Sequence, residues 1–164
     1  MLNNNLVIIG GTIGIGLSAA KAFLEQGARL VTVGRDPNSC EEAQKILGEK
    51  AKVFSGDATR EETAVGAIEE CMSSFDGLYH VAGGSGRKLG DGPVDELTLE
   101  GWNKTIELNL TSLMLSNRAA IKAFLNYQKT GTILNMGSVL GFSPSPPVLR
   151  HSRLCGRQIG NHWV

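Results

Sequence analysis

Short apolar runs alternate along the chain with longer segments in which apolar positions recur at helical spacing. The first run, residues 6–9, is continuously apolar, as a parallel strand covered on both faces requires. Further strands are predicted over residues 28–33, 52–55, 77–82 and 131–136, and helices over residues 17–26, 39–47, 60–73 and 98–127. This succession of strands and helices indicates an α/β protein.

Each predicted helix connects two predicted strands. Strands that alternate with helices of this length imply right-handed crossovers, so we expect a doubly wound parallel sheet with strand order 3-2-1-4-5. In such a sheet, ligands bind at the carboxyl ends of the strands near the point where the strand order reverses. The residues directly after each strand are therefore the candidates for chemistry.

Several helix boundaries carry recognisable signals. Gly27 lies in the C-cap position of the first helix. Ser39 is placed to cap the second helix, and Thr59 with Glu62 forms a capping-box pattern before the third. The long helix carries an apolar stripe composed of Trp102, Ile106, Leu110, Leu113 and Met114.

Glycines follow the first strand directly. Gly10 and Gly11 end the apolar run, and Gly14 and Gly16 open the next helix. Glycines let the backbone turn tightly and approach a pyrophosphate, whose charge is met by the free N–H groups and the positive dipole end of the helix. The pattern predicts a nucleotide-binding strand–turn–helix, and a glycine-rich turn without a ligand is the alternative.

The spacing G-x-x-x-G-x-G resembles the short-chain dehydrogenase/reductase family. The family's motif is T-G-x-x-x-G-I-G, and residues 9–16 read I-G-G-T-I-G-I-G, so that only the leading threonine is changed, to Ile9. The resemblance covers residues 6 to about 146 and implies a Rossmann-like fold that binds a nicotinamide dinucleotide. Within the loop it implies cofactor contacts from Gly10, Thr12, Gly14, Ile15 and Gly16.

The end of the second strand indicates which dinucleotide would bind. An acidic residue there would accept the ribose hydroxyls of NAD, whereas an arginine accommodates the extra phosphate of NADP. Gly34 stands where the family's acid usually lies, and Arg35 follows it. A guanidinium can pair with that phosphate and stack on adenine, so we expect NADP(H) as the cofactor. Asp36 keeps NAD as the alternative, and Arg35 could instead be a solvated turn residue.

Residues after the third and fourth strands match further family positions. The pair Asp57-Ala58 resembles the family's aspartate that contacts the adenine amino group, and Asp57 could also cap the next helix. After the fourth strand the family has N-N-A-G, and residues 80–83 read H-V-A-G. Ala82 and Gly83 therefore keep the small pair that lies beside the cofactor in the family.

The first residue of that H-V-A-G segment, His80, admits two interpretations. A histidine can act as an acid or a base near a reacting group. His80 is flanked by apolar residues within a predicted strand, however, and a buried polar group needs hydrogen-bond partners. We therefore interpret it as a hydrogen-bonded structural histidine.

Two positions resemble catalytic residues of the family. Asn109 begins a segment similar to N-x-x-S, whose asparagine holds a water of the proton relay, and an asparagine within an apolar stripe needs partners. Ser138 follows the fifth strand and matches the catalytic serine, whose hydroxyl bonds the substrate carbonyl; an ordinary turn serine is the alternative. The family's acid–base pair, Tyr-x-x-x-Lys, should come next, but the sequence has neither tyrosine nor lysine beyond Ser138.

The end of the chain differs in character from the rest. Residues 147–164 show neither strand nor helix period, so we divide the chain into a dinucleotide-binding domain over residues 1–146 and a tail over residues 147–164. Read one nucleotide later, the codons for residues 154–164 permit Tyr-Ala-Ala-Ala-Lys-Ser-Ala-Ile-Ile-Gly, which resembles the family's active-site helix. We therefore hypothesise a frameshift between about residues 143 and 149 that ends the chain early.

Charge and cysteine content narrow the expected partners and compartment. The 16 basic and 16 acidic residues leave no net charge and no basic run, which argues against nucleic acid and membrane partners. No signal peptide or transmembrane span is visible, so we expect a cytoplasmic protein. Cys40, Cys71 and Cys155 are odd in number and lack a C-x-x-C pair, so neither a disulfide framework nor a metal site is predicted.

The combined patterns predict an NADP(H)-dependent oxidoreductase that moves hydride between nicotinamide and a small carbonyl or alcohol substrate, inactive as written because the Tyr–Lys pair is absent. A non-catalytic NAD(P)-binding protein and an unfolded gene fragment are the alternatives. The resemblance implies that the full-length form has further strands and is a homo-oligomer. Without those strands the fifth strand has an unpaired edge, so we expect the 164-residue chain to be poorly soluble or marginally stable.

Overall fold

The computed structural model describes residues 4–86, 90 and 95–138. The chain divides into two compact units, one made of Met1–Ala82 with Ser112–Asn135 and the other of Gly83–Thr111 with Met136–Val164. The first unit contains the sheet. The tail over residues 147–164 and the hypothesised frameshift lie outside the described residues.

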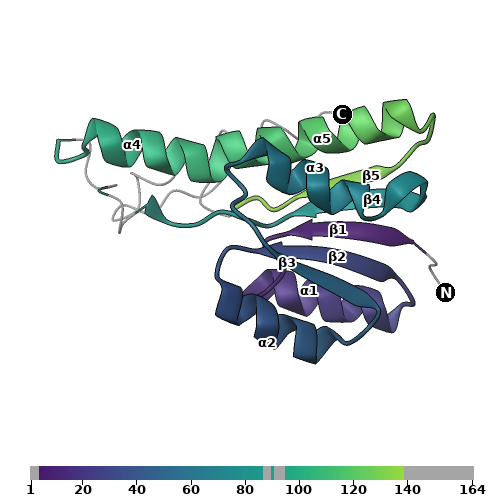
Figure 1. Cartoon of the computed structure of the whole chain (residues 1–164). Coiled ribbons are helices and arrows are strands. Elements are labelled where there is room, and N and C mark those ends of the chain that lie inside the picture. The colour runs from purple at the N-terminus through teal and green to yellow at the C-terminus, as the bar shows by residue number, and fades with distance from the viewer. Residues whose placement is uncertain (1–3, 87–89, 91–94, 139–164) are drawn as a thin grey trace. The chain divides into compact units, whose positions relative to one another are not determined.

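Five parallel strands form one sheet in the predicted order, β3-β2-β1-β4-β5 (Figure 1). The strands are β1 (Asn5–Ile9), β2 (Arg29–Gly34), β3 (Ala51–Ser55), β4 (Phe75–His80) and β5 (Thr132–Asn135). The register pairs Ile8 of β1 with Thr32 of β2 and with Tyr79 of β4. The predicted strands are confirmed, with ends that differ by about two residues or fewer, the usual uncertainty of such boundaries.

Helices cover both faces of the sheet in the first unit. They are α1 (Gly14–Glu25), α2 (Pro37–Leu47), α3 (Glu61–Glu69) and α5 (Ser112–Asn126), with a 3-10 turn, η1, at Met72–Ser74. In Figure 1, α1 and α2 lie on one face, and α3 and α5 lie on the other. The second unit contains α4 (Leu99–Ile106) and a π-helical segment, η3, at Glu107–Thr111.

Burial of β1 on both faces explains its continuous apolar run. Val7 and Ile9 belong to the hydrophobic cluster that includes α3 and α5, whereas Ile8 belongs to the cluster that includes α1 and α2. Each of these three side chains is at most 1% exposed. Successive side chains of a strand point to opposite faces, so both faces of β1 need apolar residues.

The predicted start of α2 is wrong. The N-cap is Asp36 rather than Ser39, and its carboxylate accepts hydrogen bonds from the Ser39 N–H at 2.9 Å and the Ser39 hydroxyl at 2.7 Å. Pro37 occupies the first helical position, where its missing N–H is not needed and its fixed φ suits a helix. The proline thus moves the helix start forward, and Ser39 lies inside the first turn.

The predicted capping box of α3 is also wrong. The N-cap is Arg60, which makes no side-chain capping bond. The Thr59 hydroxyl donates instead to the Asp57 carboxylate at 2.8 Å, and the Thr59 N–H donates to the same oxygen at 2.9 Å. The Asp57 carboxylate, two residues before Thr59, competes with the helix for the threonine hydroxyl. Thr59 therefore closes a turn onto Asp57, and the N-terminus of α3 has no side-chain cap.

At the C-terminus of α1 the structure agrees better with the sequence, because Gly27 directly follows the C-cap Gln26.

The predicted long helix begins as expected, after the N-cap Thr98, whose hydroxyl accepts from the Gly101 N–H at 3.0 Å. Its large apolar stripe holds only in part, because Leu113 is buried but Met114 is 44% exposed. The buried positions of α5 are mostly small: Ser112, Leu113, Leu115, Ser116, Ala119, Ala120 and Ala123. Small side chains let α5 approach the sheet closely, and the stripe expected from large residues alone missed this face.

Candidate functional site

The loop between β1 and α1, here called the glycine loop, contacts the ends of both strands that neighbour β1. The N–H groups of Gly10 and Gly11 donate to the Val33 carbonyl at 2.8 and 3.0 Å. Gly10 has a φ of +92°, and a Cβ there would lie 2.6 Å from the backbone nitrogen of Ala82. Only glycine therefore fits, and its lack of a side chain lets Ala82, two residues after the end of β4, approach the loop.

The N-terminus of α1 opens directly from this loop. A Cβ on Gly16 would overlap the carbonyl of Gly10, so the helix can start here only with glycine. Gly14 has a φ of +52° and no atom within 4 Å of an added Cβ. The N-cap residue Ile13 makes no side-chain capping bond, so this helix end keeps N–H groups and its positive dipole for an anion. These features fit the pyrophosphate of a dinucleotide.

The turn after β2 contains Arg35 and Asp36, whose side chains have different surroundings. The hydrogen bonds from Ser39 hold the pKa of the Asp36 carboxyl below its usual value, so Asp36 is an ionised helix cap. Arg35 is exposed, and within residues 4–86, 90 and 95–138 it forms no ion pair. Its carbonyl accepts from the Ser55 hydroxyl at 3.2 Å, which ties its backbone to the end of β3.

The turn after β3 holds the predicted adenine contact. The backbone N–H of Thr59, aided by its hydroxyl and by nearby Arg35 and Arg60, holds the pKa of Asp57 below its usual value against partial burial. Asp57 is therefore ionised at neutral pH. Ala58 packs against the core on the α3 side of the sheet. The alternative role of Asp57 as the cap of α3 is not seen, because its side chain closes the turn to Thr59 instead.

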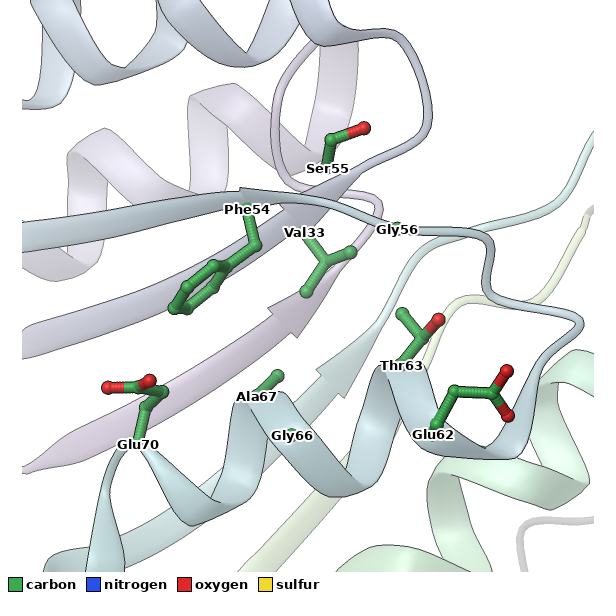
Figure 2. A pocket seen from close by; sticks show the side chains of 9 residues that line it. All are labelled: Val33, Phe54, Ser55, Gly56, Glu62, Thr63, Gly66, Ala67 and Glu70. Atoms are coloured by element: carbon green, nitrogen blue, oxygen red, sulfur yellow. The ribbon is translucent and has the colours of Figure 1, made fainter.

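A cavity of about 320 Å³ lies between β3 and α3. Figure 2 shows Phe54 and Val33 pointing toward α3, with Glu62 in the first turn of the helix and Glu70 directly after its end. Gly66 lies between these two glutamates on the helix. None of the candidate site residues lines this cavity, so it is separate from the glycine loop.

His80 is a hydrogen-bonded structural histidine, as predicted. It is 1% exposed, and its Nδ1 lies 3.0 Å from the Ser116 hydroxyl while its Nε2 lies 3.4 Å from the Ser112 hydroxyl. Burial lowers the pKa of His80 to about 4, so the imidazole is neutral at neutral pH. Both serines are themselves buried, and their spacing of one helical turn was the signal in the sequence that could have indicated this partnership.

The second unit contains Gly83 and both predicted catalytic residues. Asn109 lies in the π-helical segment, a local widening that often occurs at functional sites. Its Nδ2 donates to the carbonyls of Gly84 and Thr105 at 3.0 Å, and its Oδ1 accepts from the Gly84 N–H at 2.9 Å. The asparagine thus has the partners that its position demands, and it fixes the backbone directly after Gly83. Ser138 lies three residues beyond β5 and is half-buried.

Neither a membrane span nor a metal site is present in the part of the chain that the structure describes. No helix there combines the length and hydrophobicity that a bilayer crossing needs. No group of three or more His, Cys, Asp or Glu side chains in those residues could hold a metal ion.

The sheet order and the glycine loop that opens α1 define a class of protein, the nucleotide-binding α/β proteins with a Rossmann-like sheet. Within that class, the family model described as short chain dehydrogenase matches residues 4–150. The chain belongs to the short-chain dehydrogenase/reductase family.

Named relatives agree with this assignment. The 2-(S)-hydroxypropyl-CoM dehydrogenase 3 of Xanthobacter autotrophicus is 33% identical over 150 residues, which cover 88% of this chain and 57% of that protein. The NADP-dependent (R)-specific alcohol dehydrogenase of Lentilactobacillus kefiri is 30% identical over 142 residues, covering 85% of this chain and 56% of that protein. The chain thus spans somewhat more than half the length of these relatives.

Solved structures share the fold. The structure of ElxO with NADP bound has a TM-score of 0.83 at 24% identity and covers 97% of this chain and 65% of its own. The serine dehydrogenase of Escherichia coli has a TM-score of 0.79 at 23% identity, covering 93% of this chain and 70% of its own. These likenesses concern the fold of the chain.

Proposed function

We propose that this chain is the cofactor-binding part of an NADP(H)-dependent oxidoreductase that transfers hydride between nicotinamide and a small carbonyl or alcohol substrate. The dinucleotide would give hydride to a carbonyl, or accept it from an alcohol, at nicotinamide carbon 4, and the full-length protein would supply binding, orientation and proton transfer. The proposed cofactor contacts are Gly10, Thr12, Gly14, Ile15, Gly16, Arg35, Asp57, Ala58, Ala82 and Gly83. We keep the prediction that the protein is cytoplasmic and that its full-length form is a homo-oligomer.

The residues at the end of β2 favour NADP over NAD. The strand ends in Gly34, so no acid is present at that position to accept ribose hydroxyls. Asp36, the counter-argument from the sequence, is engaged as the cap of α2. Arg35 remains as an exposed cation without an ion-pair partner among the described residues. Its guanidinium suits a bidentate pair with the 2′-phosphate.

The comparisons support the same choice. One relative is named as an NADP-dependent alcohol dehydrogenase, and two of the solved structures with this fold are of ElxO with NADP or NADPH bound.

The proposed catalytic residues are Ser138, which would bond the substrate oxygen, and Asn109, which would hold a water of the proton relay. The acid–base pair expected after Ser138 is absent from the sequence, a loss that should lower the rate by about 10²-fold or more. The frameshift hypothesis would explain the absence. Sequencing the coding DNA in independent clones tests it, and an intact frame that encodes this tail would refute it.

Binding of the two reduced dinucleotides tests the cofactor proposal. We expect NADPH to bind more tightly than NADH, and Arg35→Ala to reduce that preference by about 1 to 3 kcal/mol, the range for hydrogen bonds to charged groups. Arg29→Ala, at the opposite end of the same strand, is the matched control and should leave the preference unchanged. Dissociation constants can be measured from the fluorescence of the bound nicotinamide. Equal affinities in the parent protein would rule out the role of Arg35.

A non-catalytic dinucleotide-binding protein is the second candidate. The missing tyrosine and lysine favour it, because nothing in the glycine loop or at β2 requires those residues for binding. If the coding DNA has an intact frame, NADPH binding by the 164-residue chain without turnover of a panel of aldehydes and ketones would favour this candidate. A gene fragment that does not fold would show no cooperative unfolding transition.

A further inference from the structure

The glycine loop and the end of β2 pack through two reciprocal glycine–threonine pairs. Thr32 of β2 lies against Gly11 of the loop, where an added Cβ would come closer than 3.0 Å to the Thr32 hydroxyl oxygen. Thr12 of the loop lies in the same way against Gly34 at the end of β2. The two threonines are 0% and 5% exposed. Each segment therefore lacks a side chain where the other provides one.

The backbone on the loop side of the Thr12–Gly34 pair is held in place. The N–H groups of Gly10 and Gly11 both donate to the Val33 carbonyl, the residue before Gly34. This double hydrogen bond fixes the distance between the loop and the strand end. The loop cannot move away from position 34 without losing both bonds.

The backbone on the strand side is held as well. The Gly34 carbonyl accepts from the Gly56 N–H at 2.8 Å and from the Cys40 thiol at 3.5 Å. A Cβ at position 34 would approach the hydroxyl, the methyl group and the Cβ of Thr12, all closer than 3.0 Å. With both backbones fixed, only a change at Thr12 itself makes room for a side chain.

We infer that Thr12 determines the dinucleotide specificity of this protein, because it fills the space that an acidic side chain at position 34 would need. The inference rests on the proposed function. Position 34 is the place from which a carboxylate would accept the ribose hydroxyls of NAD. With Thr12 present, that position stays glycine, and Arg35 is the first side chain that the strand end offers. Two residues from separate segments thus set the cofactor preference together.

The packing itself is tested by thermal unfolding of the full 164-residue chain. Gly34→Ala should lower Tm, and Thr12→Gly combined with Gly34→Ala should recover part of that loss, because the double variant removes the overlap. Gly66→Ala is the matched control, since an added Cβ there meets no atom within 4 Å and alanine is the better helix former. It should not lower Tm.

The specificity is tested by the dissociation constants of NADPH and NADH. Gly34→Asp alone should weaken the binding of both dinucleotides, because the aspartate and Thr12 compete for one space and distort the loop. Thr12→Gly with Gly34→Asp should shift the preference toward NADH by about tenfold or more relative to Thr12→Gly alone, the size expected of hydrogen bonds to a charged group.

The outcomes separate this inference from the proposed function. If Gly34→Asp keeps the parent Tm and shifts the preference as far as the double variant does, Thr12 excludes nothing and the inference is wrong. If Gly34→Ala and Gly66→Ala have the same Tm, the packing argument is wrong as well. Failure of the parent to bind either dinucleotide would overturn the proposed function and its specificity, while the Tm series would still report on the packing pair.

Discussion

Two strands of the sheet, the central strand β1 and the last described strand β5, differ in how completely their apolar side chains are covered. On the β1–β3 side, β1 is paired on both edges, and its residues Val7, Ile8 and Ile9 are almost fully buried. On the β4–β5 side, β5 is paired with β4 alone among the described strands, and Leu134 is 49% exposed. Both strands are short apolar runs in the sequence. The comparison teaches that such a run identifies a strand but does not reveal how much of it is covered.

The difference continues in the packing around β4 and β5. A cavity of about 230 Å³ is lined by Leu6, Phe23, Tyr79 and Leu134, among others. Phe23 of α1 meets the Tyr79 ring edge-on, with centroids 6.5 Å apart, and Leu134 is the register partner of Tyr79 on β5. Apolar surface on this face of β4 and β5 is therefore only partly covered by described residues.

The largest predicted difference between the two sides is the stability effect of shortening an apolar side chain. Ile8→Ala should lower the free energy of unfolding by about 2 to 5 kcal/mol, because it leaves a cavity in a fully buried site. Leu134→Ala should change it by about 0.5 kcal/mol or less, as expected for a surface position. Urea denaturation of both variants measures the two values. Equal losses would show that β5 is buried in solution and would break the comparison.

The second prediction concerns β4, where His80 lies against α5. Its pKa is about 4 in the folded protein, because of burial, and about 6.5 in the unfolded chain. Below pH 6.5 the unfolded chain therefore binds more protons than the folded one. The contribution of neutral His80 to the free energy of unfolding should therefore be fully present above about pH 6.5. It should be lost as the pH is lowered toward about 4, which reduces the free energy of unfolding by about 3 kcal/mol.

The His80→Asn variant isolates that contribution. Asparagine retains hydrogen-bonding groups but does not titrate in this range. Acidic groups that lose stabilising contacts at low pH, such as Asp57, are present in both proteins, so the difference between parent and variant reports on His80 alone. Denaturation midpoints at several pH values supply the measurement. Parallel curves for parent and variant would mean that His80 is not buried as a neutral imidazole.

The smallest predicted effect on stability comes from Leu134→Lys, which should still change self-association. Among the described strands β5 has β4 as its single partner, and Leu134 is exposed. An exposed apolar side chain on such an edge strand favours intermolecular pairing, and a lysine there opposes it. We expect the parent chain to be poorly soluble or marginally stable, and the variant to remain in solution at higher concentration. Light scattering during a concentration series measures this. A parent chain that is a soluble, cooperatively unfolding monomer would contradict the expectation and favour the non-catalytic binding protein.

The sequence by itself determined the strand positions, the sheet order and the place of the glycine loop. The strand positions and the loop follow from apolar runs and glycine spacing, which are local properties. The sheet order agrees with the Rossmann-like fold that the glycine spacing implies, because crossover handedness alone allows more than one order. The burial of His80 was also foreseeable from its flanking residues, because a polar group inside an apolar strand must find partners. Its actual partners, Ser112 and Ser116, come from a helix more than thirty residues away, and only their one-turn spacing hinted at them.

The tertiary structure decided which of several competing polar groups are used and which glycines are obligatory. Asp36 caps α2 in place of Ser39, and Thr59 binds Asp57 instead of capping α3, because each hydrogen bond depends on where the backbone turns. The packing of Thr12 against Gly34 joins segments that meet only in the folded sheet. Patterns along the chain record which residues are apolar or can hydrogen-bond, whereas the choice among partners depends on distances that only folding sets.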